Sequence, residues 1–313
     1  MESFKDDFKK SGGVKKIADF AREGVLGTVC GEILLLGRSH KALEIANLSA
    51  QFKIYNKLEK RYKKYIKTNT ETNVAELSNK TVWLCWVQGI EKAPELVKRC
   101  YKSVEDNFPN WNVVVITEDN LLNYTDFPTY IIEKWKKGII TNTHFSDLLR
   151  VELLTRHGGL WLDATVYCTS CLPKYIENTD LFFYQVLKPG FTGHVNRVSS
   201  WLIWARPNNF ILNETKSLLW RYWKIENELF DYFLFHYFLT MVLNSNEEML
   251  NRIIPSSNEA PHVLLLRLFD QYDEQLWQAI KIQTPFHKLS YKFDKDKENL
   301  AGTYYDVVIR KEK

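Results

Sequence analysis

The stretch Ser146-Asp-Leu-Leu-Arg-Val-Glu-Leu-Leu-Thr-Arg-His-Gly-Gly-Leu-Trp-Leu-Asp-Ala-Thr165 decides how this chain folds. Leucines recur in its first half at the spacing of one helix face, which predicts a helix over residues 142–157. The two glycines that follow favour a helix end, because glycine readily takes the left-handed conformation of a C-cap. An apolar strand over 160–162 comes next, and Asp163 stands where it ends. The chain is therefore expected to turn from a helix directly into a buried strand that finishes on a carboxylate.

Three charged side chains of this stretch suit ligand binding. Asp147 and Arg150 are neighbours on the helix surface, and Asp163 is expected at the carboxyl end of a strand, where α/β folds bind ligands. Carboxylate oxygens suit Mg²⁺ or Mn²⁺, which neutralises a diphosphate. Arg150 can bind a phosphate or sugar oxygen, and Asp147 can accept hydrogen bonds from sugar hydroxyls. The alternative is structural: an internal Asp–Arg ion pair and an Asp that caps a turn.

Outside this stretch, apolar β-branched runs alternate with segments of helical period. Strands are expected over 81–87, 111–117, 160–163, 181–186 and 198–205. Helices are expected over 41–67, 94–107, 128–137, 142–157, 208–226 and 231–244. This alternation predicts an α/β layered sheet. A polar segment over 68–80 separates an N-terminal helical region, 1–80, from a second domain, 81–313.

Composition limits the class of protein. With 313 residues, 45% of them hydrophobic, the chain can bury a large core, which excludes disorder and a small disulfide scaffold. Five cysteines, an odd number without a signal peptide, favour reduced thiols and a cytosolic location. Residues 1–80 contain 16 Lys and Arg against 10 Asp and Glu, whereas residues 81–313 contain 26 against 28. The basic surplus is N-terminal, and without a binding motif nucleic acid is not expected as a partner.

The order of the motifs resembles a known signature. Ser146-Asp147-x-x-Arg150, a Gly-Gly pair and Trp161-x-Asp163 are similar to the motifs of family 32 type glycosyltransferases and capsular polysaccharide synthesis proteins, and the clostridial glucosylating toxins carry a similar string. The resemblance covers roughly residues 81–290. It implies a GT-A fold, a Rossmann-like mixed sheet flanked by helices, and transfer of a sugar from a nucleotide diphosphate donor with retention of anomeric configuration.

The resemblance also implies a donor site. Trp86 looks like the strand-end aromatic that stacks on uracil, although core packing is its structural alternative, and Gly89 lets the backbone approach a ligand. Trp83 is assigned to the core. The donor-binding residues are then Trp86, Gln88, Gly89, Ser146, Asp147, Arg150, Trp161, Asp163 and Lys288.

The metal site departs from the family pattern. The usual Asp-x-Asp is here Asp163-Ala164-Thr165, so a hydroxyl replaces the second carboxylate and binding of Mn²⁺ or Mg²⁺ is expected to be weaker. His287 is a candidate third ligand, which favours Mn²⁺, although a lone His is more often structural. Lys288 is expected to meet diphosphate oxygens. The predicted cofactor is therefore Mn²⁺, or Mg²⁺, on Asp163, Thr165 and His287.

Asp231 is the candidate catalytic carboxylate alongside Asp163. It would face the sugar and stabilise an oxocarbenium-like centre or act as nucleophile, whereas its structural alternative is the N-cap of a helix over 231–244. His194 and His236 are weaker candidates.

The helix over 41–67 has one apolar, aromatic face and one cationic face. It can dock on an anionic membrane surface, or it can be an ordinary solvated helix packed on the next domain. The apolar run 25–37 is too short and too interrupted to span a bilayer.

These observations predict a cytoplasmic transferase that is peripheral at the inner face of the cell membrane. Its donor would be a UDP-sugar, and its acceptor a lipid-linked oligosaccharide of a surface polysaccharide. Two alternatives remain open, a sugar-phosphate transferase and a non-catalytic carbohydrate-binding or scaffold subunit of a capsule assembly complex.

Overall fold

The structure is a computed structural model that describes residues 13–68, 74–187 and 195–310. Its centre is a five-stranded mixed sheet with the strand order β2-β1-β3-β6-β5. These strands are β1 (Thr81–Cys85), β2 (Asn112–Ile116), β3 (Gly159–Leu162), β5 (Leu181–Gln185) and β6 (Val198–Ala205). β1 is parallel to β2 and β3, whereas β6 is antiparallel to β3 and β5.

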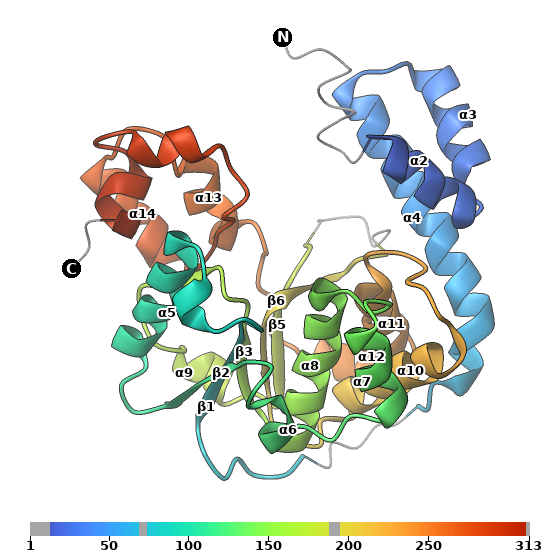
Figure 1. Cartoon of the computed structure of the whole chain (residues 1–313), viewed down its shortest axis with the longest axis horizontal. Helices are drawn as coiled ribbons and strands as arrows, with labels where there is room; N and C mark the ends of the chain where they lie inside the picture. Colours follow the sequence, from blue (N-terminus) through green and yellow to red (C-terminus); the bar gives the residue numbers. More distant parts are fainter. Residues whose placement is uncertain (1–12, 69–73, 188–194, 311–313) are drawn as a thin grey trace.

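Side chains of the strands alternate between two apolar cores. Trp83 and Trp161 lie in one core, and their neighbours Leu84 and Leu162 lie in the other. The first core is covered by α7 (Thr129–Lys136), α8 (Asn142–His157), α10 (Phe210–Ile225) and α11 (Leu234–Asn244), and the second by α5 (Glu95–Asn107) and α9 (Lys174–Glu177) (Figure 1). Because both faces of the sheet are covered, its central strands β1 and β3 are almost entirely apolar.

A third core lies under the C-terminal unit, residues 260–310. This unit contains η3 (Ala260–His262), α13 (Val263–Arg267), α14 (Glu274–Gln283), β7 (Phe286–Lys288), η4 (Lys295–Asn299) and the π-helix η5 (Tyr305–Arg310). β7 pairs antiparallel with β4 (Val166–Cys168), so that Lys288 lies opposite Val166. This pairing returns the end of the chain to the segment that follows Asp163. The remaining short helices are η1 (Lys63–Tyr65), η2 (Ile90–Lys92), α6 (Leu121–Tyr124) and α12 (Glu247–Asn251).

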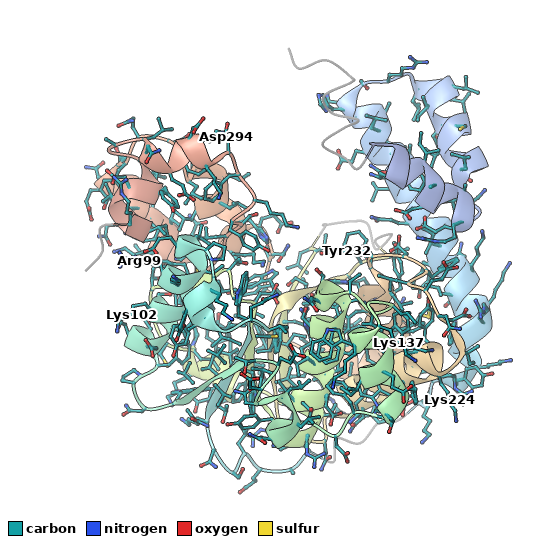
Figure 2. The ribbon with its side chains drawn as sticks, viewed as in Figure 1. Arg99, Lys102, Lys137, Lys224, Tyr232 and Asp294 are labelled. Atoms are coloured by element: carbon teal, nitrogen blue, oxygen red, sulfur yellow. The ribbon has the colours of Figure 1, made fainter. Side chains whose placement is uncertain are left out.

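The N-terminal arm consists of α2 (Gly13–Arg22), α3 (Leu26–Leu36) and α4 (His40–Tyr62) and projects from the body (Figure 1). α4 joins the arm to the body, because Tyr62 packs 5.0 Å from Phe238 and Tyr55 lies 6.3 Å from Tyr237, centroid to centroid, both partners being on α11. Figure 2 shows Tyr232, just before α11, at the same end of the body as the arm and the C-terminal unit.

The expected fold class is confirmed: a mixed α/β sheet flanked by helices, with an N-terminal helical region. α8 and β6 have the expected bounds, while the helix expected over 231–244 begins only at Leu234. β4 and β7 have no counterpart in the sequence prediction. In the described residues, no helix combines the length and the apolar character that crossing a membrane requires.

Candidate functional site

Two glycines form the tight turn between α8 and β3. Gly158 ends α8 with φ 68° and donates its N–H to Leu154. Gly159 has φ 103°, and a Cβ there would lie 2.5 Å from the carbonyl oxygen of Thr81 on β1. Both positions need glycine, because a side chain would be strained by the backbone conformation and would clash with a neighbouring segment. The tight turn places the end of β3 beside α8.

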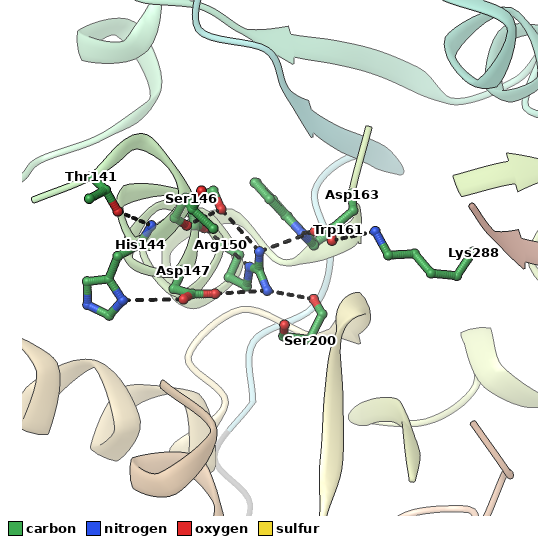
Figure 3. A network of polar contacts seen from close by, with 10 residues as sticks. Thr141, His144, Ser146, Asp147, Arg150, Trp161, Asp163, Ser200 and Lys288 are labelled. Carbon is green, nitrogen blue, oxygen red and sulfur yellow. Dashed lines mark hydrogen bonds and ion pairs between the residues drawn. The ribbon is translucent and has the colours of Figure 1, made fainter. Parts of the chain in front are cut away.

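Arg150 is the centre of the polar network between α8 and β3 (Figure 3). Its Nε donates to the carbonyl oxygen of Ser146, and Nη2 contacts the Ser146 hydroxyl (3.3 Å) and Asp163 Oδ1 (3.2 Å). Nη1 reaches Asp147 Oδ1 (3.1 Å) and the carbonyl oxygen of Ser200 (3.0 Å). These five contacts match the five N–H donors of a guanidinium. Arg150 therefore holds the site together, whereas the sequence suggested that it binds a phosphate or sugar oxygen.

Asp163 is held by partners on both of its oxygens. Oδ1 accepts from Arg150 and from the indole of Trp161 (3.1 Å), and Oδ2 lies 3.0 Å from the ammonium of Lys288. Lys288 also donates to the hydroxyl of Thr165 (2.6 Å). Burial raises the pKa of Asp163, but the charges of Lys288 and Arg150 and the hydrogen bonds outweigh it and bring the pKa down to about 2. The carboxylate is thus ionised at neutral pH.

Asp147 is buried on the other side of Arg150. Its Oδ2 lies 3.4 Å from Nδ1 of His144, and the indole N–H of Trp223 donates to Nε2 of that histidine, so Nδ1 is the ring nitrogen that faces Asp147. Burial raises the pKa of Asp147, yet Arg150 and His144 leave it below its usual value. His144, which the sequence did not single out, therefore orients a site carboxylate.

These side chains line one cavity of about 610 Å³, a size typical of small-molecule sites. Nine of the predicted site residues border it, namely Trp86, Gln88, Ser146, Asp147, Arg150, Trp161, Asp163, Thr165 and Lys288. Trp86 meets Tyr291 edge to face, with ring centroids 5.8 Å apart. The pocket is thus formed by residues of α8, by residues at or just after the ends of β1 and β3, and by residues of the C-terminal unit.

The cavity also contains residues that the sequence did not identify or ranked low. Tyr232, Ser200 and His262 border it, and so does His236 on α11. Burial lowers the pKa of His236 to about 4 despite the nearby charge of Asp147, so its imidazole is neutral at pH 7. These residues come together through contacts between segments distant in sequence. Their place at the cavity could therefore not be predicted from a local sequence pattern.

Three predicted residues do not border the cavity. Gly89 has φ 87° and precedes η2. Asp231 turns away: its carboxylate accepts the N–H of Phe233 (2.7 Å), and its charge interacts with Asp19 and Arg22 of the arm. It is not the N-cap of α11 either, because that position is Phe233. The placement of Asp231 does not suit contact with a sugar.

His287 is also placed away from the cavity. It is completely buried, its Nε2 lies 3.2 Å from the hydroxyl of Thr169, and its ring packs 5.4 Å from that of Trp277. Burial lowers its pKa to about 3. Side chains of a strand alternate, so if Lys288 points to Asp163 then His287 must point to the opposite side of β7.

A divalent cation fits this arrangement poorly. Mg²⁺ and Mn²⁺ prefer several oxygen ligands, usually one or two carboxylates with waters and phosphates. Here the expected oxygen ligands are Asp163, whose two oxygens already contact cationic groups, and the Thr165 hydroxyl, which accepts from Lys288. Asp147, which also borders the cavity, is already engaged by Arg150 and His144. Across the described residues, no three His, Cys, Asp or Glu side chains are grouped so that they could hold a metal ion.

The profile of the capsular polysaccharide synthesis protein family matches residues 38–308, a region that includes α4. The O-glycosyltransferase braB of Annulohypoxylon truncatum is 29% identical over 118 residues, which are 35% of this chain and 28% of that protein. The PaToxG glycosyltransferase structure aligns with 82% of this chain and 93% of its own at 14% identity and a TM-score of 0.37.

The chain thus spans under a third of the length of the curated relative that it matches. The family profile, in contrast, covers well over half of the chain, including all the strands and the whole cavity. The chain therefore belongs to the capsular polysaccharide synthesis protein family, which is glycosyltransferase-like.

Proposed function

We propose that this protein is a retaining glycosyltransferase that takes a UDP-sugar and transfers the sugar to a lipid-linked oligosaccharide of a growing surface polysaccharide. One observation carries the proposal. Asp163, its α8 neighbours Asp147 and Arg150, and the indole of Trp86 border a single cavity large enough for a nucleotide sugar. Membership of the capsular polysaccharide synthesis family supports the same activity.

The cavity offers a partner for each part of the donor. The partly exposed ring of Trp86, supported by Tyr291, presents an aromatic face to uracil. Lys288 offers an ammonium to the diphosphate, and Asp147 and the neutral imidazole of His236 accept hydrogen bonds from sugar hydroxyls.

The proposed reaction breaks the bond between the anomeric carbon and the oxygen of the β-phosphate. The acceptor hydroxyl oxygen forms the new bond to that carbon, on the same face of the sugar, and the hydroxyl proton leaves with UDP. Asp163 does not bond the sugar in this scheme; it fixes the position of Lys288 beside the leaving group.

The test is UDP release from UDP-sugars in the presence of saccharide acceptors. Asp163→Asn and Asp147→Asn are each expected to reduce turnover at least tenfold, because the first leaves the Lys288 ammonium without its carboxylate and the second removes one of the two carboxylates that hold Arg150. Asp296→Ala, an exposed position outside the cavity, is the control. Near-full turnover by both site variants, with normal folding shown by circular dichroism, would rule out this donor site.

The N-terminal arm supports docking at an anionic membrane surface. Leu34 and Leu35 on α3 are 86% and 82% exposed. On α4, the apolar side chains of Ile45, Leu48 and Phe52 are also exposed. Leu34 and Leu35 are consecutive on α3, and a lipid interface can accommodate such a pair of exposed leucines.

Part of the basic and aromatic surface of α4 is engaged within the protein. The aromatic face is packed on the body through Tyr55 and Tyr62. Of the cationic residues, Lys57 donates to backbone carbonyls at 23 and 24, and Arg61 pairs with Glu226. We therefore propose that the exposed leucines provide the membrane contact and that the basic surplus of residues 1–80 steers the arm to anionic lipid.

A further inference from the structure

We propose that Lys288 takes the place of a divalent metal ion in the donor site, so that its ammonium, with no bound metal, contacts the diphosphate and transfer is independent of metal. The inference rests on the proposed glycosyltransferase function and names the group that serves the leaving UDP. It replaces the sequence-based expectation of Mn²⁺ or Mg²⁺ on Asp163, Thr165 and His287.

The ammonium bridges the two groups that were expected to hold the metal. Lys288 Nζ lies 3.0 Å from Asp163 Oδ2 and 2.6 Å from Thr165 Oγ1 (Figure 3 shows the contact with Asp163). A metal at the same place would have to displace the ammonium, which would then lose its anionic partner beside an added double charge. The replacement of a second carboxylate by Thr165 removes the negative charge that would favour such an exchange.

The position of Lys288 is fixed by backbone structure. Lys288 is the last residue of β7 and lies opposite Val166 in the β4–β7 pair, and the N–H of Leu289 donates to the carbonyl oxygen of Thr165 (2.9 Å). Backbone pairing on both sides therefore holds the base of this side chain. A lysine held in this way is preorganised, which is the condition for strong stabilisation of developing charge.

Lys288 retains donor capacity for a ligand, whereas Arg150 does not. An ammonium has three N–H donors, and Asp163 and Thr165 use two of them. The side chain is 21% exposed and borders the cavity, so the third N–H is available to a β-phosphate oxygen. As the bond to the anomeric carbon breaks, negative charge grows on that oxygen, and the ammonium stabilises it. Asp163 and Thr165 act as positioning residues for Lys288.

The experiment measures UDP binding by calorimetry and UDP release with the full chain, in EDTA and in added Mn²⁺. The expected result is an affinity and a turnover that agree within twofold between the two conditions. Lys288→Ala and Lys288→Met should each weaken UDP binding at least tenfold, and Lys288→Arg should restore part of it. Lys295→Ala, on η4 outside the cavity and next to Asp294 (Figure 2), removes the same charge and should bind like the wild type.

The outcomes separate this inference from the proposed function. UDP binding that needs Mn²⁺, or that is unchanged in both neutral Lys288 variants, overturns the inference and leaves the transferase intact. Absence of UDP binding by the wild type in both conditions overturns the proposed function itself. Thermal unfolding of each variant shows whether it is folded when it is assayed.

A double variant tests whether a metal ion can bind when the ammonium of Lys288 is removed and a second carboxylate is added. T165D combined with K288A restores an Asp-x-Asp and removes the competing ammonium, so it should bind Mn²⁺ and bind UDP in an EDTA-sensitive way. Electron paramagnetic resonance reports bound Mn²⁺ without an activity assay. The wild type is expected to leave Mn²⁺ free, and Mn²⁺ bound by the wild type as tightly as by the double variant would contradict the inference.

Discussion

Arg150 shows how a buried cation can be structural and still control a site. Its five N–H donors are all engaged, two of its partners are the site carboxylates Asp147 and Asp163, and its guanidinium lies 5.1 Å from the ring of Trp161. The arginine thereby aligns α8, β3 and β6 around one centre. Activity is expected to depend on it through the geometry of Asp163 and Lys288.

Arg150→Ala is expected to lower the free energy of unfolding by about 3–5 kcal/mol, because it leaves the buried carboxylate of Asp147 without its main cation. Urea unfolding followed by circular dichroism measures this loss. Lys288→Ala is the matched comparison and should cost far less, since Asp163 is partly exposed and can be hydrated. A wild-type stability for Arg150→Ala would show that the network is not structural.

At the level of elements, the turn between α8 and β3 sets the position of the site. Gly159→Ala places a Cβ 2.5 Å from the Thr81 carbonyl oxygen at a φ of 103°. The substitution should therefore lower the free energy of unfolding by about 1–3 kcal/mol. The control is Gly27→Ala on α3, where a Cβ meets nothing within 4 Å and helix propensity favours alanine. Urea midpoints compare the two, and equal midpoints would show that β1 moves to make room.

Protein stability is expected to depend on pH through Glu23, a buried carboxyl of the arm. Burial, followed by the charge of Asp231, raises the pKa of Glu23 to about 8 from an ordinary value of 4.5, and the side chain is 4% exposed. The folded state therefore holds a proton that the unfolded chain releases. The stability that Glu23 contributes is complete below pH 4.5 and is lost as pH rises towards 8.

Glu23→Gln keeps the neutral form at every pH. Its melting temperature should equal that of the wild type near pH 4.5 and exceed it increasingly up to pH 8. Differential scanning calorimetry at pH 5, 6.5 and 8 measures the gap. A gap that does not widen with pH would mean that Glu23 is ionised in the folded protein.

The elements that the sequence predicted are those with a long apolar pattern. α8 has the expected bounds because Thr141 and Gly158 cap its ends, and β6 because it is a long, largely apolar run. β4 and β7 were missed because three residues carry no period and their pairing joins residues more than a hundred positions apart. That pairing also decides between His287 and Lys288: the sequence offered both, and only the register of β7 selects the lysine for the cavity.

At the level of the whole molecule, the candidate site could be predicted where one local stretch supplies it. Asp147, Arg150 and Asp163 belong to one helix–turn–strand unit, so their convergence follows from local structure. His236 and Tyr291 belong to segments distant in sequence, and only tertiary packing brings them to the cavity. Asp231, in contrast, was predicted to line the site and does not border the cavity. Asp231 precedes the cavity residue Tyr232, yet it faces the arm, because the direction of a loop side chain depends on what packs beside it.

The exposed leucines of the arm are expected to determine how strongly the whole protein binds to membranes. Full burial of one leucine is worth about 1.5–3 kcal/mol, so Leu34→Ser combined with Leu35→Ser should reduce binding to vesicles more than tenfold. Flotation with vesicles of phosphatidylcholine and phosphatidylserine measures binding, and pure phosphatidylcholine shows the contribution of anionic lipid. Leu122→Ser combined with Leu266→Ser is the control, since these leucines are 71% and 78% exposed but lie outside the arm.

Charge reversal at Lys60, Lys63 and Lys64 should weaken flotation at low salt and have a smaller effect at 0.15 M salt, because screening shortens electrostatic attraction. The leucine variant should lose binding at both salt concentrations, since apolar contact is not screened. If the leucine variant floats like the wild type while charge reversal abolishes binding, then the basic face of α4 docks the protein and the apolar end of the arm does not. If neither set of changes affects flotation, the arm has no role at the membrane.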